Sequence, residues 1–234
     1  MSEKEIQEEG FKLCKRCLRI KPQLDFQPSV HRRKKLTNYC ISCRTSQQKS
    51  IINPTTQNGK CREFWINWKK QQTCIDCGLT DYRVIEADHV RGTKIYNVGE
   101  SKWWAYNGGV DAMKEEVKKC EARCSFCHNV KTKERADLKR KLEGRKQNAT
   151  MKRRRHEINM TKLKIGECKI CHRKVTVQTC NGFDYDHRDE ETKIINISHI
   201  VYKKKEEYEK HFKEEIPKCD LLCRNCHRIK THYN

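Results

Sequence analysis

Six C-x2-C pairs dominate this sequence of 234 residues, which contains 16 cysteines. The pairs are Cys14/Cys17, Cys40/Cys43, Cys74/Cys77, Cys124/Cys127, Cys168/Cys171 and Cys223/Cys226. Two such pairs supply the four thiolates of a tetrahedral structural zinc site. If each pair closes with its neighbour in sequence, the chain binds about three zinc ions. Exchange of pairs between sites is the alternative pairing.

The composition also favours small modules held together by metal. Hydrophobic residues make up only 35% of the chain, and the formal charge is +21, which disfavours a single large core. The acidic, polar opening residues do not form a signal peptide, and no apolar run approaches the roughly 20 residues of a membrane span. We therefore expect an intracellular protein of the cytoplasm or nucleus, neither secreted nor bound to membranes, in which cysteines bind zinc rather than form disulfides.

Comparison of the chain with itself reveals an internal repeat. The segment KEEVKKCEARCSFCHNVKT from Lys114 aligns with KEEIPKCDLLCRNCHRIKT from Lys213 at an offset of 99 residues. At the same offset, TKIYN from Thr93 aligns with TKIIN from Thr192. At an offset of 98, the Asp-His pair at 88–89 aligns with the pair at 186–187. The chain therefore contains one module twice, and each copy has the order C-x2-C, Asp-His, C-x2-C-His.

Local patterns predict how each copy folds. Residues leading to each Asp-His pair alternate between apolar and polar, which is typical of a strand. The run after each last cysteine pair lacks Gly and Pro, so it can continue as a helix that carries His128 or His227. We expect small α+β modules stabilised by zinc, in which a zinc knuckle, a hairpin and a helix place an Asp, a His and a second His around one cleft.

These residue types predict metal-assisted hydrolysis. In the first copy, Asp88 and His128 are expected to bind a divalent ion, while His89 takes a proton from the attacking water. The corresponding residues of the second copy are Asp186, His227 and His187. An ion held in this way can clamp a phosphate oxygen and stabilise the leaving 3′-oxygen. Phosphodiester hydrolysis is therefore the predicted reaction.

At these residues the chain resembles the HNH endonuclease family, whose treble-clef (ββα-metal) members read C-x2-C, then D-H, then C-x2-C-H-x2-K-T. The second copy, with FDYDHRD and KCDLLCRNCHRIKT, is the closer match. The resemblance implies HNH modules at residues 61–135 and 165–234, joined by a basic linker at 136–164. It also implies DNA cleavage with a divalent metal, usually magnesium.

One position departs from the family pattern. The central Asn of the family is expected about five residues before the third zinc cysteine, where this chain has Lys119 and Lys218. Asn97 and Asn196 occur in both copies but lie earlier in the sequence. The first copy also diverges more from the pattern. We therefore favour the second copy as the more competent one and keep open that the other only binds DNA.

The remaining segments are predicted to bind rather than to catalyse. Residues 1–50 form a zinc-ribbon-like four-cysteine module, similar to the short zinc modules that often precede HNH domains. Residues 131–156 contain 12 Lys and Arg against 3 Asp and Glu, a balance that favours contact with a DNA backbone over a merely solvated face. The expected DNA contacts are Lys131, Lys152, Arg153, Arg154, Arg155 and Lys230.

Three functions compete on the sequence alone. The first is a metal-dependent DNA endonuclease, and the second is a non-catalytic, zinc-stabilised DNA-binding or architectural protein. The third is a protein-interaction scaffold, which the strong positive charge disfavours. The Asp-His-His set in both copies favours the endonuclease, because structural zinc needs none of these residues. The target sequence and the oligomeric state are not predicted.

Overall fold

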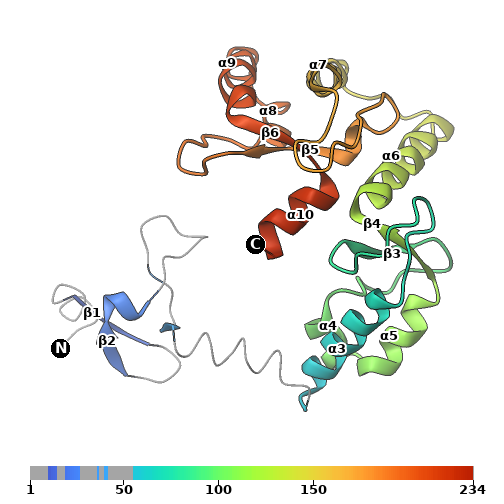
Figure 1. Ribbon diagram of the computed structural model, residues 1–234, viewed down its shortest axis with the longest axis vertical. Helices are drawn as coiled ribbons and strands as arrows, with labels where there is room; N and C mark the ends of the chain where they lie inside the picture. Colours follow the sequence, from blue (N-terminus) through green and yellow to red (C-terminus); the bar gives the residue numbers. More distant parts are fainter. Residues whose placement is uncertain (1–9, 15–18, 27–35, 37–39, 42–54, 234) are drawn as a thin grey trace. The chain divides into compact units, whose positions relative to one another are not determined.

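The computed structural model describes residues 10–14, 19–26, 36, 40–41 and 55–233 (Figure 1). The chain divides into two compact units. The first comprises Met1–Ile66 and Ile95–Glu116, and the second comprises Asn67–Lys94 and Val117–Asn234. None of the helices in the described ranges has the length and apolar character needed to cross a membrane.

The first unit contains part of the predicted N-terminal zinc module. Strand β1 (Phe11–Leu13) pairs antiparallel with β2 (Ile20–Pro22), and a short helix η1 (Gln23–Asp25) follows. Cys14 and Cys40 are both buried, and the backbone N–H of Cys40 donates to Sγ of Cys14 at 3.3 Å. Two of the four expected ligands therefore lie together, whereas Cys17 and Cys43 are outside the described residues.

Three helices complete the described part of this unit. They are α3 (Gln57–Lys70), which continues beyond the unit boundary, α4 (Ser101–Tyr106) and α5 (Gly109–Val117). Trp104 is buried and its Nε1 donates to the carbonyl of Asn97 at 3.0 Å, while Trp103 stacks on Tyr96 with ring centroids 4.4 Å apart. Residues 95–116, which the sequence assigns to the first HNH-like module, thus group with the N-terminal residues.

The second unit contains the cysteine pairs, the hairpin and the following helix of both copies of the repeat. Strand β3 (Ile85–His89) pairs antiparallel with β4 (Cys120–Cys124), and β5 (Phe183–His187) pairs with β6 (Cys219–Cys223). Each hairpin leads directly into a helix, α6 (Ser125–Leu142) or α10 (Arg224–Tyr233). The predicted strand at each Asp-His pair and the predicted helix after each last cysteine pair are both confirmed. Below, the first copy means Cys74/Cys77 with β3, β4 and α6, and the second copy means Cys168/Cys171 with β5, β6 and α10.

The predicted linker is mostly helical. Its residues form the end of α6 and nearly all of α7 (Ala149–Ile165). The side chain of Asn148 caps α7 by accepting from the backbone N–H of Met151 at 3.0 Å, and Gly166 ends it with a φ of 83°. Ile158 of α7 is buried in a cluster with Ile197, Ile200 and Val201, so α7 packs on the second copy instead of acting as a spacer.

The other elements of the second copy are short. They are η2 (Cys180–Gly182), α8 (Ile197–Ile200), α9 (Lys205–Glu215) and η3 (Ile216–Lys218). Helices α8 and α9 contribute to the cluster around Ile158 through Ile200 and Tyr208, which are both buried. Together with α7, they surround one side of the β5–β6 hairpin (Figure 1).

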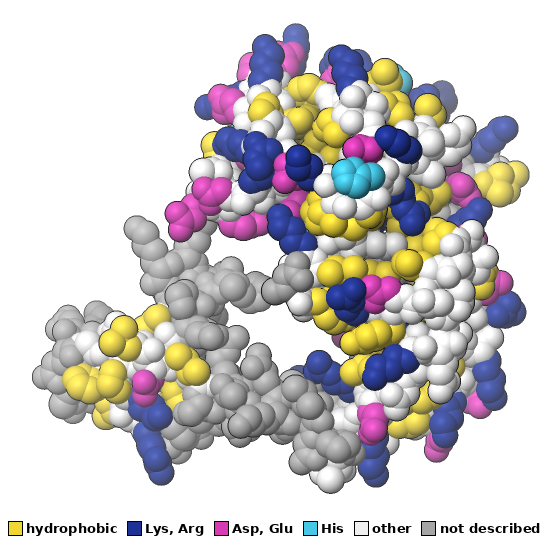
Figure 2. Space-filling model, in the orientation of Figure 1, with side chains coloured by type: hydrophobic (Ala, Val, Ile, Leu, Met, Phe, Trp, Pro, Cys, Tyr) yellow, Lys and Arg dark blue, Asp and Glu magenta, His cyan; other side chains and the backbone are white. Residues whose placement is uncertain are grey.

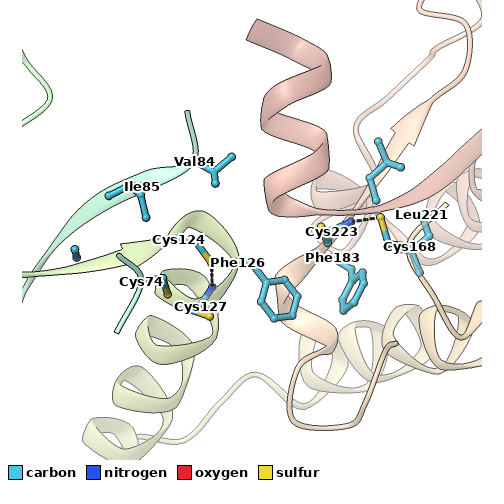
Figure 3. Close-up of a cluster of buried hydrophobic side chains, with 12 residues drawn as sticks. Cys74, Val84, Ile85, Cys124, Phe126, Cys127, Cys168, Phe183, Leu221 and Cys223 are labelled. Atoms are coloured by element: carbon cyan, nitrogen blue, oxygen red, sulfur yellow. Dashed lines mark hydrogen bonds between the residues drawn. The ribbon is translucent and has the colours of Figure 1, made fainter. Parts of the chain in front are cut away.

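The two copies share one hydrophobic core. Phe126 of the first copy meets Phe183 of the second edge-to-face, with ring centroids 5.3 Å apart (Figure 3). Gly182 allows this approach, since a Cβ atom there would lie 2.5 Å from Cε2 of Phe126. The guanidinium of Arg173 lies 4.3 Å from the centroid of the Phe126 ring. Figure 3 shows the two rings side by side, with Cys124 and Cys127 of the first copy next to Phe126.

Candidate functional site

Two four-cysteine groups stand at the base of the two hairpins. They are Cys74, Cys77, Cys124 and Cys127 in the first copy, and Cys168, Cys171, Cys223 and Cys226 in the second. Within each group the ligand atoms all lie within 4.8 Å of one another. Pairing between sequence neighbours is thereby confirmed for these two groups, and Cys120 and Cys219 belong to neither.

The sulfur geometry fits zinc. A tetrahedral ion with Zn–S bonds of about 2.3 Å separates its ligands by roughly 3.8 Å. Sγ of Cys77 lies 3.8 Å from Sγ of Cys124, and Sγ of Cys171 lies 3.6 Å from Sγ of Cys223. The backbone N–H of Cys223 donates to Sγ of Cys168 at 3.2 Å. Although burial opposes it, such N–H groups lower the pKa of Cys168 to about 7, which favours the thiolate that binds metal.

In the second copy, a histidine stands between two carboxylates. Asp184 and Asp186 lie two residues apart on β5, so they face the same side of the strand. Nδ1 of His227, in the first turns of α10, lies 3.3 Å from Oδ2 of Asp184, and its Nε2 lies 3.4 Å from Oδ1 of Asp186. The hydrogen bond to Asp184 raises the pKa of His227. We call Asp184, Asp186 and His227 the second acidic cluster.

The first copy repeats this arrangement with Glu86, Asp88 and His128, which we call the first acidic cluster. Nδ1 of His128 lies 2.6 Å from Oε2 of Glu86, and its Nε2 lies 3.3 Å from Oδ1 of Asp88. Although burial opposes ionisation, the contacts with His128 and Arg228 lower the pKa of Glu86. The structure therefore brings together the expected metal ligands Asp88 with His128, and Asp186 with His227.

The two clusters differ in the cations around them. Nη1 of Arg123 donates to Asp88 at 2.7 Å, and Nη2 of Arg135 donates to both carboxylate oxygens of Asp88 at 2.7 Å. Arg228 pairs with Glu86, so three guanidinium groups neutralise the first acidic cluster. The side chain of Asp88 is only 4% exposed. A divalent ion would have to displace at least one of these arginines from the carboxylates.

The second acidic cluster is more open. The side chains of Asp184 and Asp186 are 35% and 13% exposed. Their cationic partners are Arg224, whose Nε lies 3.4 Å from Asp184, and the flexible Lys230, which contacts Asp186. At the repeat offset of 99, the position of Arg123 is occupied by Leu222 in this copy. The charge balance thus leaves more room for a divalent ion than in the first copy.

The donor chemistry of the second acidic cluster suits a divalent ion, because carboxylate oxygens are ligands of Mg²⁺ or Mn²⁺ and an imidazole is a ligand of transition-metal ions. Within the described residues, only the two four-cysteine groups bring three or more ligand atoms within 4.8 Å of one another. His227 contacts Asp184 through Nδ1 and Asp186 through Nε2, which lie on different sides of its ring. Its ring must therefore turn before all three side chains can share one ion.

The structure places His187 away from this cluster. It follows Asp186 on β5, and neighbouring residues of a strand face opposite sides. Its side chain is 3% exposed, and its Nε2 lies 3.0 Å from Oε2 of the fully buried Glu215. Glu215 also accepts from the backbone N–H of Ile194 at 3.1 Å and pairs with Lys218. His89 ends β3 at the matching register, opposite Cys120 as His187 is opposite Cys219. The expected single cleft containing Asp186, His187 and His227 is not what the chain forms.

The predicted DNA contacts have diverse surroundings. Arg154 is buried, donates to the carbonyls of Val201 and Lys203 at 3.0 and 2.6 Å, and lies over the ring of Tyr208. It therefore holds α7 against the second copy. Lys152, Arg153, Arg155 and Lys230 are exposed. Ion pairs join Arg153 to Glu157, Lys131 to Glu134 and Lys230 to Asp186. On the face shown in Figure 2, Lys and Arg side chains are interspersed with Asp and Glu rather than gathered in one continuous patch.

Two cavities adjoin the second acidic cluster. The larger, of about 540 Å³, lies between α7, α8 and β5, and the smaller, of about 390 Å³, includes residues of α10 and Glu86 of the first copy. Asp184, Arg224 and His227 line both cavities. Asp184 and His227 are thus accessible from both cavities, whereas Asp186 lines neither.

The sequence reasoning missed Glu86 and Asp184. The signal was present, because the apolar-polar alternation of IEADH and FDYDH places each of them on the same strand face as the next acidic residue. It also missed Glu215, whose only sequence mark is its match with Glu116 in the repeat. The neutralising arginines of the first acidic cluster come from different elements and could not be grouped from spacing.

Comparison of the chain with models of protein families, with curated proteins and with solved structures found no match. The similarity to the HNH family therefore rests on the residues of the two copies.

Proposed function

We propose that this protein is a metal-dependent DNA endonuclease that hydrolyses phosphodiester bonds, and that the second copy carries its active site. The second acidic cluster is the observation that supports this proposal most strongly. Two carboxylates and an imidazole meet there on a strand and a helix, beside Arg224 and at the edge of two cavities. Such donors bind a divalent ion and leave a cation next to it for a phosphate group.

Each residue of the cluster has a part in this proposal. Asp184 and Asp186 would hold the ion, with His227 as the third ligand once its ring leaves the bridging position. When bound, such an ion supplies Lewis-acid stabilisation of the negative charge on the phosphate. Arg224, which lines both cavities, binds a phosphate oxygen of the DNA strand.

The proposal gives His187 a positioning role rather than that of the general base expected from the sequence. Its buried contact with Glu215 holds the end of β5 while Glu215 binds the backbone at Ile194. This arrangement fixes the strand that carries Asp184 and Asp186. We assign the first copy a binding and structural role, because Arg123, Arg135 and Arg228 already neutralise its carboxylates.

Incubation with supercoiled plasmid tests the proposal. Nicked or linear product should form when Mg²⁺ is added and should not form when it is omitted. Omission is preferable to chelation, because a chelator would also remove the structural zinc. His227→Ala should abolish cleavage, while His156→Ala, an exposed change on α7, should not. If the protein binds plasmid but does not cut it with any divalent ion that is added, the result would favour the alternative of a non-catalytic DNA-binding protein.

A further inference from the structure

The larger cavity has walls of three different chemical kinds. Its lining includes three apolar side chains that belong to the buried cluster of α7 and α8, namely Ile158, Ile197 and Val201. Asparagine amides line it from three separate segments, at Asn159, Asn181 and Asn196. Cations line it at Arg155, Lys162 and Arg224. The volume of about 540 Å³ is within the range of pockets that enclose small organic ligands.

Helix α7 supplies one wall because of its periodicity. Arg155, Asn159 and Lys162 stand at positions i, i+4 and i+7, so they share one face of the helix. Nη2 of Arg155 donates to the hydroxyl of Tyr202 at 3.3 Å, which places an exposed cation beside an aromatic ring that is 65% exposed. Lys162 lies deeper and donates to the carbonyls of Cys180 and Phe183.

The charge of the lining favours an anionic ligand. Three cations face one carboxylate, that of Asp184, together with His227. An aromatic ring, several amides and a group of cations are what a nucleotide needs, since its base stacks and forms hydrogen bonds while its phosphate takes the positive charge. A free phosphate would not need contacts with the apolar side chains of the lining or with the ring of Tyr202.

We infer that this cavity binds one unstacked nucleotide of the nucleic-acid strand that crosses the second acidic cluster, with its base against Tyr202 and its phosphate toward Arg155 and Arg224. The smaller cavity is also lined by Arg224 and His227, so the two cavities adjoin at the second acidic cluster. The inference rests on the proposed function, which makes a nucleic-acid strand the substrate. It adds that the substrate is single-stranded at this point, since a base cannot enter the cavity while paired and stacked in a duplex.

Calorimetric titration of the full chain with dTMP, thymidine and inorganic phosphate, in buffer without added Mg²⁺, tests the inference. We expect dTMP to bind at least about tenfold more tightly than thymidine or phosphate alone. Tyr202→Ala and Arg155→Ala should each weaken dTMP binding by about tenfold, as the loss of one base stack or one charged contact does. Both side chains are exposed, and unchanged zinc content checks that the variants fold.

Lys164→Ala is the matched control, because Lys164 is an exposed cation on the same helix that neither lines the cavity nor belongs to the expected DNA contacts. It should leave dTMP affinity unchanged. Phosphate binding as tight as dTMP, or dTMP affinity indifferent to Tyr202 and Arg155, would overturn the inference. The titration needs no cleavage, so a chain that binds dTMP but leaves DNA intact would keep the cavity assignment and lose only the endonuclease.

Discussion

The backbone N–H of Phe126 donates a hydrogen bond of 2.9 Å to Oδ1 of Asn225, the residue that holds the same position in the other copy of the repeat. Contact between equivalent positions is what a two-fold arrangement of two modules produces near its axis. The two equivalent residues differ in type, one being phenylalanine and the other asparagine. The ring of Phe126 packs on Phe183. The two copies therefore form an asymmetric pair with one core.

The packing of Phe126 against the second copy predicts that a side chain added at Gly182 destabilises the protein. In Gly182→Ala, the new Cβ would lie 2.5 Å from a rigid ring carbon of Phe126, so we expect a loss of about 1–3 kcal/mol in the free energy of unfolding. Phe126→Ala alone should cost about 3–5 kcal/mol by leaving a cavity. Denaturant unfolding of both single variants and the double variant measures this. The double variant should lose less than the sum, and strict additivity would contradict the contact.

Zinc should be part of the folding free energy of each copy. Elemental analysis of the purified chain should find about three zinc ions, two of them in the four-cysteine groups of the second unit. Cys223→Ser should release one ion and unfold the second copy, because metal binding and folding are coupled. Cys180→Ser, at a buried cysteine outside both groups, is the control and should keep the full zinc content. Fewer than two ions per chain would contradict the account.

The pH dependence of stability should report on Glu215. Although burial opposes it, Lys218, the N–H of Ile194 and His187 lower the pKa of Glu215 from 4.5 to about 2. A carboxyl whose pKa is lowered by folding stabilises the protein fully above its unfolded value, near 4.5, and loses that contribution as the pH falls toward 2.

Glu215→Gln should therefore reduce the free energy of unfolding by about 1–3 kcal/mol at pH 7, and the difference from the parent should shrink below pH 4.5. Unfolding curves between pH 2.5 and 7 provide the measurement. Glu214→Gln, at the exposed neighbouring position, should show no such trend. A Glu215→Gln deficit that stays constant down to pH 2.5 would show that charge is not its cause.

Regular local patterns explain why much of the fold was predictable. The alternation in IEADH and FDYDH predicts β3 and β5, and the register of the repeat predicts two similar hairpins. The same alternation already implies that His187 faces away from Asp186, and the single-cleft expectation neglected this. Contacts such as Arg135 with Asp88, 47 residues apart, depend on how α6 packs and leave no mark in local spacing.

Helix α7 should contribute to DNA binding only through its exposed Lys and Arg residues. Neutralising Lys152, Arg153 and Arg155 together should weaken binding to all sequences similarly and reduce the slope of log affinity against log salt by about 0.9 per lost phosphate contact. Fluorescence anisotropy at several salt concentrations measures that slope. Arg154→Ala should instead lower stability, since Arg154 is buried and holds two carbonyls of the second copy. An unchanged slope in the triple variant would show that these residues are merely solvated.

The central claim is that the second copy, and not the first, cuts DNA, and cleavage of supercoiled plasmid by Asp186→Asn and Asp88→Asn tests it most directly. Both changes preserve shape, and Arg123 keeps Asp76 and Glu121 as partners in Asp88→Asn. With Mg²⁺ present and zinc content equal, Asp88→Asn should nick plasmid at a rate close to that of the parent, while Asp186→Asn should be inactive. Equal activity of Asp186→Asn and the parent, or loss of cleavage only in Asp88→Asn, would contradict the account.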